Sequence, residues 1–230
     1  MNAISFVASA FANDYLVTLI PDGEDCQTYR VSCATLCETS EYFRAALQGN
    51  FREVSSGILT FPGFDDKTLQ GFVYWLSEGD LPDHEDFLSW DVRDRDEQDF
   101  NERLLEWELL LIRLWAFGDQ HLLPRLQNRA MIPLLQAMME QTLAPQAVRE
   151  IFERTAKDAQ LRRAATIQVT GDLTGTYYQD DEVEELSQIP GLLVAVMNEN
   201  RKCHGGLKRG CKCDVLCCRV DGRQESFMVE

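Results

Sequence analysis

Short β-rich runs and amphipathic helical stretches alternate in the first eighty residues of the chain. The β-rich runs end at clusters of Pro, Gly and Asp, and the helical stretches place apolar residues three and four apart. A turn cluster at residues 21–25 joins the first two runs, which predicts a hairpin. We predict strands at residues 15–20, 26–31 and 58–61, and helices at residues 32–38, 41–47 and from Asp65 or Asp66 to about residue 78.

The second half of the chain is predicted to be helical. Residues 104–118 are apolar on nearly every face, which is typical of a central buried helix. Further helices begin at Pro124, with a break or kink at Pro133, and at Pro145. The Gly- and Thr-rich residues 170–176 are predicted to form a loop, and a last helix runs over residues 183–197 past Pro190.

The order and spacing of these elements resemble a BTB/POZ domain of the fungal type. The segments that carry the resemblance are residues 42–47, 51–53, 58–61, 72–76 and 114–128. The resemblance covers residues 14–138 and implies an α+β fold, in which helical hairpins cap a small three-stranded sheet. It also implies a helical C-terminal extension at residues 142–200. Residues 1–13 are then an N-terminal helix or arm, and residues 201–230 a basic, Cys-rich tail.

Members of this family associate with themselves or with other proteins, and some recruit partners to a cullin ubiquitin ligase. Cullin-binding members carry an apolar residue, any residue and Glu after the second helix, where this chain has Phe51, Arg52 and Glu53. An exposed aromatic anchor with an adjacent carboxylate suits a partner pocket. So short a pattern also recurs by chance, and Phe51 packing beneath its own loop is the competing interpretation.

The chain departs from the family at two places. Dimeric members match a buried Asp near the first strand with a basic residue, and here Ser32 and Cys33 replace the usual His-Lys. A buried Asp14 without a partner would be costly, so either Asp14 is exposed or the usual dimer is altered. The second departure is an acidic insert at residues 83–103, of which residues 91–101 are predicted to be an exposed loop.

Charge is distributed unevenly along the chain. The formal net charge is −16, which argues against general nucleic-acid binding. Residues 78–108 contain thirteen acidic and three basic residues, whereas the tail from residue 201 contains seven basic and four acidic ones. No apolar run approaches the length of a membrane span, and no basic residue precedes the weakly apolar residues 4–12. We therefore expect a cytoplasmic or nuclear protein without membrane contact.

The eight cysteines fall into two groups. Cys26, Cys33 and Cys37 occupy predicted strand and helix positions and are expected to be core residues. The tail holds the other five, and Zn²⁺ bound by Cys203, Cys211, Cys213 and Cys217 is one interpretation. Their spacing does not reproduce paired Cys-x-x-Cys knuckles, so a basic tail with incidental thiols, or palmitoylation, stays open. No other cofactor is expected.

No nucleophile elbow, phosphate loop, dinucleotide fingerprint or His-Glu-x-x-His motif occurs in the sequence. We therefore interpret the chain as a non-enzymatic protein-interaction module that forms homodimers or serves as a cullin adaptor. The alternative is a nuclear regulator whose metal-binding Cys-rich tail contacts nucleic acid or an acidic partner.

Overall fold

The structure is a computed structural model of the 230-residue chain. It describes residues 14–24, 26–49, 55–82, 97–205 and 227–229, and only the backbone of residues 97–101 and 202–205. The predicted N-terminal helix or arm at residues 1–13 and most of the Cys-rich tail lie outside the described residues. So do residues 83–96 of the acidic insert.

The chain divides into two compact units. The first unit comprises Met1–Asp83 and Phe117–Leu126, and the second comprises His84–Ala116 and Gln127–Glu230. Helix α7 (Glu97–Gln120) therefore contributes its last turn to the first unit and its remainder to the second. The domain limits at residues 138 and 142 stay predictions.

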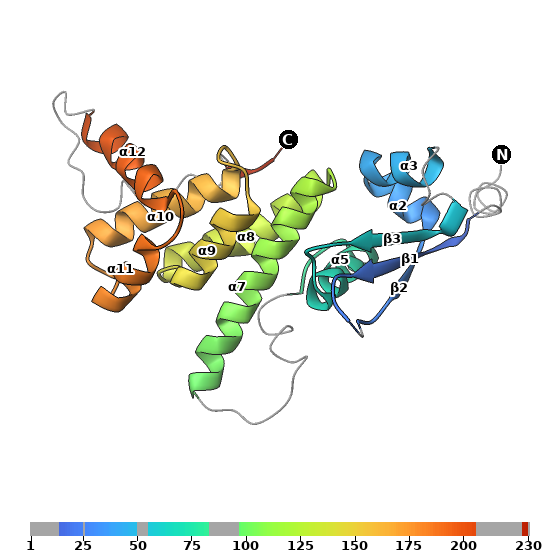
Figure 1. The fold of residues 1–230 in the computed structure, drawn as a ribbon, viewed down its shortest axis with the longest axis horizontal. Helices are drawn as coiled ribbons and strands as arrows, with labels where there is room; N and C mark the ends of the chain where they lie inside the picture. Colours follow the sequence, from blue (N-terminus) through green and yellow to red (C-terminus); the bar gives the residue numbers. More distant parts are fainter. Residues whose placement is uncertain (1–13, 25, 50–54, 83–96, 206–226, 230) are drawn as a thin grey trace. The chain divides into compact units, whose positions relative to one another are not determined.

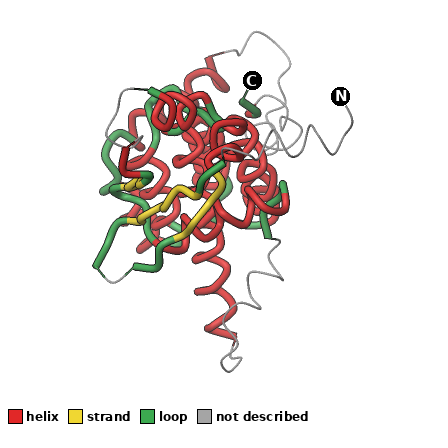
Figure 2. The backbone as a smooth tube through the Cα atoms, turned by 90° about the vertical axis from the view of Figure 1, so that its right-hand side faces the viewer, coloured by secondary structure: helices red, strands yellow, loops and turns green. Residues whose placement is uncertain are grey.

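The described part of the first unit combines a three-stranded sheet with helices (Figure 1). Its elements are β1 (Leu16–Pro21), β2 (Tyr29–Ser32), α2 (Cys33–Thr39), α3 (Glu41–Gln48), β3 (Ile58–Phe61) and α5 (Asp66–Glu78). β1 lies in the centre of the sheet, antiparallel to β2 and parallel to β3. Figure 2 shows the strands in yellow. The chain is thus α+β, and the predicted strands and helices of this unit are confirmed within a few residues at their ends.

Alternation along the strands determines which side chains of the sheet enter the core. Val17 and Leu19 of β1 and Leu59 and Phe61 of β3 are buried, whereas their sequence neighbours are at least partly exposed. Phe43 of α3 packs against Phe61 with ring centroids 6.3 Å apart. The alternation of buried and exposed residues in β1 and β3 therefore indicates that one face of the sheet is covered and that the described helices leave the other face accessible.

The described part of the second unit is helical. Its elements besides α7 are α8 (Pro124–Glu140), α9 (Pro145–Arg154), α10 (Gln160–Thr174), α11 (Asp180–Ser187) and α12 (Leu192–Gly205). Helix α10 contacts both α9 and α12, and α11 contacts α9 and α12 (Figure 1). Pro133 lies inside α8, which continues to Glu140, so the helix does not break there. None of the helices in the described ranges is long and apolar enough to cross a membrane.

The prediction of a loop at residues 170–176 is wrong for residues 170–174. Helix α10 runs to Thr174, and its positions 164–172 are buried throughout. The hydroxyls of Thr166, Thr170 and Thr174 donate to backbone carbonyls four residues earlier, at 2.7–2.8 Å. These bonds satisfy the polar side chains inside the helix, and burial of the helix outweighs the weak helix propensity of Thr and Gly.

The prediction of a single helix over residues 183–197 is also wrong. The chain forms α11 and α12, separated at Pro190 and Gly191. Pro190 has no backbone N–H to donate, and Gly191 takes a left-handed φ of 83° that begins the second helix in a new direction. Two short helices therefore replace the predicted long one, and α12 continues as far as Gly205.

Two smaller expectations change. Cys33 and Cys37 are buried as predicted, but Cys26 is half-exposed in the turn after β1, where its thiol donates to the Asp22 carbonyl at 3.4 Å. Residues 97–101 of the predicted exposed loop are the first residues of α7. Trp75, Trp107 and Trp115 are buried, and Trp90 lies outside the described residues.

Candidate protein-interaction surface

The predicted partner-binding residues Phe51, Arg52 and Glu53 lie outside the described residues. They follow α3, which Ser40 begins by accepting a hydrogen bond from the Tyr42 amide at 3.0 Å. Tyr42 is 40 % exposed, so the helix that leads into this segment presents an aromatic side chain to its surroundings. The structure leaves the adaptor prediction untested.

Three large apolar side chains of the first unit are exposed where β1 and β3 begin. They are Tyr15 at 41 %, Leu16 at 50 % and Ile58 at 40 % exposure, and we call them the strand-end cluster. Thr18 of β1 pairs with Ile58 of β3, so the two side chains lie on the same face of the sheet. Leu16 lies two residues before Thr18 and therefore points to that face as well. The Tyr15 ring lies 4.0 Å from the position that a β-carbon on Gly57 would occupy.

The same alternation that fills the core also exposes Leu16 and Ile58 of this cluster. Val17 and Leu59 point to the covered face and are buried, so Leu16 and Ile58 must point to the opposite face. Sequence reasoning placed these residues in strands but did not select them as a surface. The sequence pattern that could have indicated this surface is that both strands begin with an apolar residue, at a position that alternates with the buried ones.

Asp14 stands beside this cluster and has partners of an unexpected kind. Its carboxylate accepts hydrogen bonds from the Ser32 hydroxyl at 2.6 Å and from the Ala34 amide at 3.0 Å. Ser32 in turn caps α2 by accepting from the Thr35 amide at 3.1 Å. The Ser32 hydrogen bond, followed by the Ala34 amide, lowers the pKa of Asp14. Asp14 is therefore half-exposed and satisfied by the N-terminus of α2, without the basic residue of the family pattern.

Behind Tyr42, a buried histidine fixes the end of α7 in the core of the first unit. The His121 ring stacks on Phe43 at 5.8 Å and lies edge-on to Tyr42 at 4.8 Å between centroids. Its Nδ1 is 2.7 Å from the Phe117 carbonyl, and the Ser40 hydroxyl donates to the His121 carbonyl. Burial lowers the pKa of His121. We therefore interpret His121 as a neutral core residue that holds one side of the Tyr42 ring.

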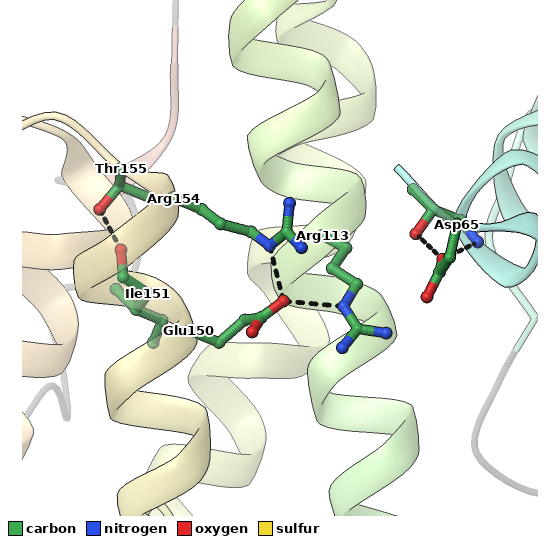
Figure 3. A network of polar contacts seen from close by, with 7 residues as sticks. Asp65, Arg113, Glu150, Ile151, Arg154 and Thr155 are labelled. Carbon is green, nitrogen blue, oxygen red and sulfur yellow. Dashed lines mark hydrogen bonds and ion pairs between the residues drawn. The ribbon is translucent and has the colours of Figure 1, made fainter. Parts of the chain in front are cut away.

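Three charged side chains of the second unit form a network of ion pairs. The Glu150 carboxylate of α9 accepts hydrogen bonds from Arg113 Nε at 2.8 Å and from Arg154 Nε at 2.6 Å, as the dashed lines in Figure 3 show. Burial by itself raises the pKa of Glu150, but the two arginines outweigh it and the net pKa is lowered. This triad links α7 to α9 and has no feature of a reactive carboxylate.

A cavity of about 480 Å³ lies between α10 and α12 in the second unit. Lys157, Arg163 and the apolar Val194 are among its lining residues, and no lining residue is His or Cys. Arg162, also in its lining, donates to the Phe152 and Thr155 carbonyls at 3.0 Å, which closes the end of α9.

The predicted metal ligands are not brought together in the part of the chain that the structure describes. Cys203 belongs to α12, where only the backbone is described, and Cys211, Cys213 and Cys217 lie outside the described residues. Among the described residues, no group of three or more His, Cys, Asp or Glu side chains could hold a metal ion. The zinc prediction therefore stays a prediction.

Comparison of the chain with protein-family models and with curated proteins finds no match to either.

Proposed function

We propose that this protein is a non-enzymatic association module of the BTB/POZ type, and that its first unit pairs with a second copy through the strand-end cluster. The observation that carries the proposal is the exposure of Tyr15, Leu16 and Ile58 together at one end of the sheet. Three half-exposed apolar side chains, two at the starts of β1 and β3 and one directly before β1, favour burial against another protein surface.

Element order supports the same proposal. The resemblance implies two strands, a helical hairpin, a third strand and further helices. The first unit runs β1, β2, α2, α3, β3 and α5, with β3 parallel to the first strand. Asp14 supports an altered mode of pairing. Its carboxylate is bound by Ser32 and by the helix N-terminus within one chain, so it needs no basic residue from a partner.

Light scattering of the full chain tests the proposal. We expect a mass near twice 26.3 kDa at micromolar concentration, and a shift toward the monomer in the variants Leu16→Asp and Ile58→Asp. Because both side chains are exposed, a carboxylate at either position leaves the fold intact. Leu193→Asp is the matched control, because Leu193 of α12 is 65 % exposed and belongs to the second unit. A concentration-independent monomer in the unsubstituted chain would exclude the proposal.

The cullin-adaptor function remains a second proposal, which rests on Phe51, Arg52 and Glu53 and on the exposed Tyr42 that precedes them. A pull-down from cell extract distinguishes it from simple self-association. We expect a cullin to be recovered with the full chain and lost with Phe51→Ala, while Gln48→Ala, an exposed change on α3, retains it. Equal recovery with Phe51→Ala contradicts this proposal and leaves the association module unaffected.

A further inference from the structure

A short C-terminal segment is bound to the second unit apart from the helices that precede it. Residues 227–229 are described, whereas residues 206–226, which join them to α12, are not. Phe227, which belongs to the second unit, is 0 % exposed, so its side chain is fully buried. In Figure 1 the C-terminus lies near α8 and α10, and contacts to Asn128 and Arg163 identify the same two helices.

Asn128 of α8 holds the backbone of this segment in two directions. Its Nδ2 donates to the Val229 carbonyl at 2.8 Å, and its Oδ1 accepts from the Val229 amide at 2.6 Å. A side-chain amide that pairs with both backbone groups of one residue reproduces the pairing that a neighbouring β-strand would supply. Such pairing recognises an extended backbone and does not depend on the side chain at the paired position.

The aromatic side chain supplies the selectivity that the backbone pairing lacks. The Arg163 guanidinium of α10 lies 5.6 Å from the centroid of the Phe227 ring, within the range of a cation–π contact. Met228, between the two anchors, is only partly buried. The contacts therefore have the form of linear-motif recognition, with one buried aromatic anchor and one backbone clamp two residues later.

We propose that α8 and α10 form a peptide-binding site, that Phe227–Val229 is its intramolecular ligand, and that the site also accepts an extended segment of another chain with an aromatic residue two positions before the clamped residue. A ligand held by one side chain and one clamped residue is weak on its own. Attachment through residues 206–226 raises its local concentration to the order of millimolar, which favours the intramolecular ligand over a free peptide. The proposal does not depend on the association proposed for the first unit.

Peptide binding to the full chain tests the site. The probe is a fluorescently labelled peptide with the sequence of residues 224–230, measured by anisotropy. We expect saturable binding to the Phe227→Ala variant at least tenfold tighter than to the unsubstituted chain, because the intramolecular competitor has lost its anchor. The same peptide with Ala at the Phe position should bind at least tenfold more weakly. Adding Asn128→Ala to Phe227→Ala should abolish binding, whereas Gln136→Ala, an exposed amide on the same helix, should retain it.

A second variant keeps the test valid if Phe227→Ala folds poorly. Val229→Pro removes the amide that donates to Asn128 but retains the aromatic anchor, so we expect an intermediate gain in peptide affinity. Circular dichroism establishes that each variant is folded. The proposal would be refuted if the peptide bound the unsubstituted chain and both folded variants with equal affinity, or if it bound neither variant saturably.

Discussion

Glu108 provides the most quantitative test of the structure. It is 2 % exposed in α7, and its carboxylate accepts a hydrogen bond from Gln141 Nε2 at 2.8 Å. Burial raises the pKa of Glu108 to about 7, although the Gln141 hydrogen bond opposes the change. The carboxyl group is therefore neutral in the folded chain at pH 5 and charged at pH 8.

The sign of the effect follows from the two pKa values. The folded pKa of about 7 lies above the ordinary value of 4.5, so the folded state binds the proton more tightly than the unfolded state does. The contribution of Glu108 to the free energy of unfolding is therefore fully present below pH 4.5 and is lost as the pH rises through 7. At about 1.4 kcal/mol for each pH unit between the two values, the loss amounts to about 3 kcal/mol.

Glu108→Gln removes the titration but keeps the shape and an oxygen for Gln141. Urea denaturation at pH 4.5 should give nearly equal free energies of unfolding for both chains. At pH 8 the Gln variant should be more stable by about 3 kcal/mol. Glu102→Gln, an exposed change on the same helix, should change the free energy of unfolding by less than about 0.5 kcal/mol. A Glu108→Gln difference that does not change between pH 4.5 and 8 would show that the carboxylate is not buried as the structure describes.

Three further substitutions test local contacts. Ser32→Ala removes the cap of α2 and one hydrogen bond to Asp14, and should lower the free energy of unfolding by about 1–2 kcal/mol in urea denaturation at pH 7. Because the native contacts lower the pKa of Asp14, the stability that they provide is lost as the pH falls below 4. Gly79→Ala forces a side chain into a left-handed φ of 77° and should lower the midpoint of thermal unfolding, at a cost of about 1 kcal/mol. Glu150→Gln removes the carboxylate that Arg113 and Arg154 share, and should lower the free energy of unfolding by about 2 kcal/mol in urea denaturation. An unchanged urea midpoint would contradict a stabilising role of these ion pairs.

The sequence predicted those parts of the fold in which local preference and burial agree. In β1, apolar and polar positions alternate in the phase that the core requires, so the strand and its buried residues could be predicted together. Asp65 likewise begins α5 as expected, because its carboxylate accepts from the Thr68 amide at 2.9 Å. In these segments the residue pattern and the tertiary contacts favour the same structure.

Prediction failed where tertiary contacts outweigh local preference. The residues around Thr170 have a composition typical of a loop but form a buried helix, because neighbouring helices enclose them. Glu108 belongs to the most acidic stretch of the sequence and yet lies in the core. Nothing in the local sequence indicates that Gln141 donates to it, since that contact joins residues 33 positions apart.

The candidate surfaces were less predictable than the fold for a related reason. Exposure of Leu16 and Ile58 depends on which face of the sheet the helices cover, and a strand pattern by itself gives only the alternation. The Asn128 clamp joins residues 101 positions apart and has no motif that would reveal it. Such long-range contacts require the three-dimensional structure.

The division of α7 between the two units affects the order of events during synthesis. Phe117 and His121 complete the aromatic core of the first unit, yet they are translated after the whole segment 84–116, which belongs to the second unit. A nascent chain that has emerged only to residue 83 therefore lacks part of the core it needs. Folding of the first unit must wait until α7 has left the ribosome. The earliest stop codon compatible with a complete first unit then lies beyond residue 126.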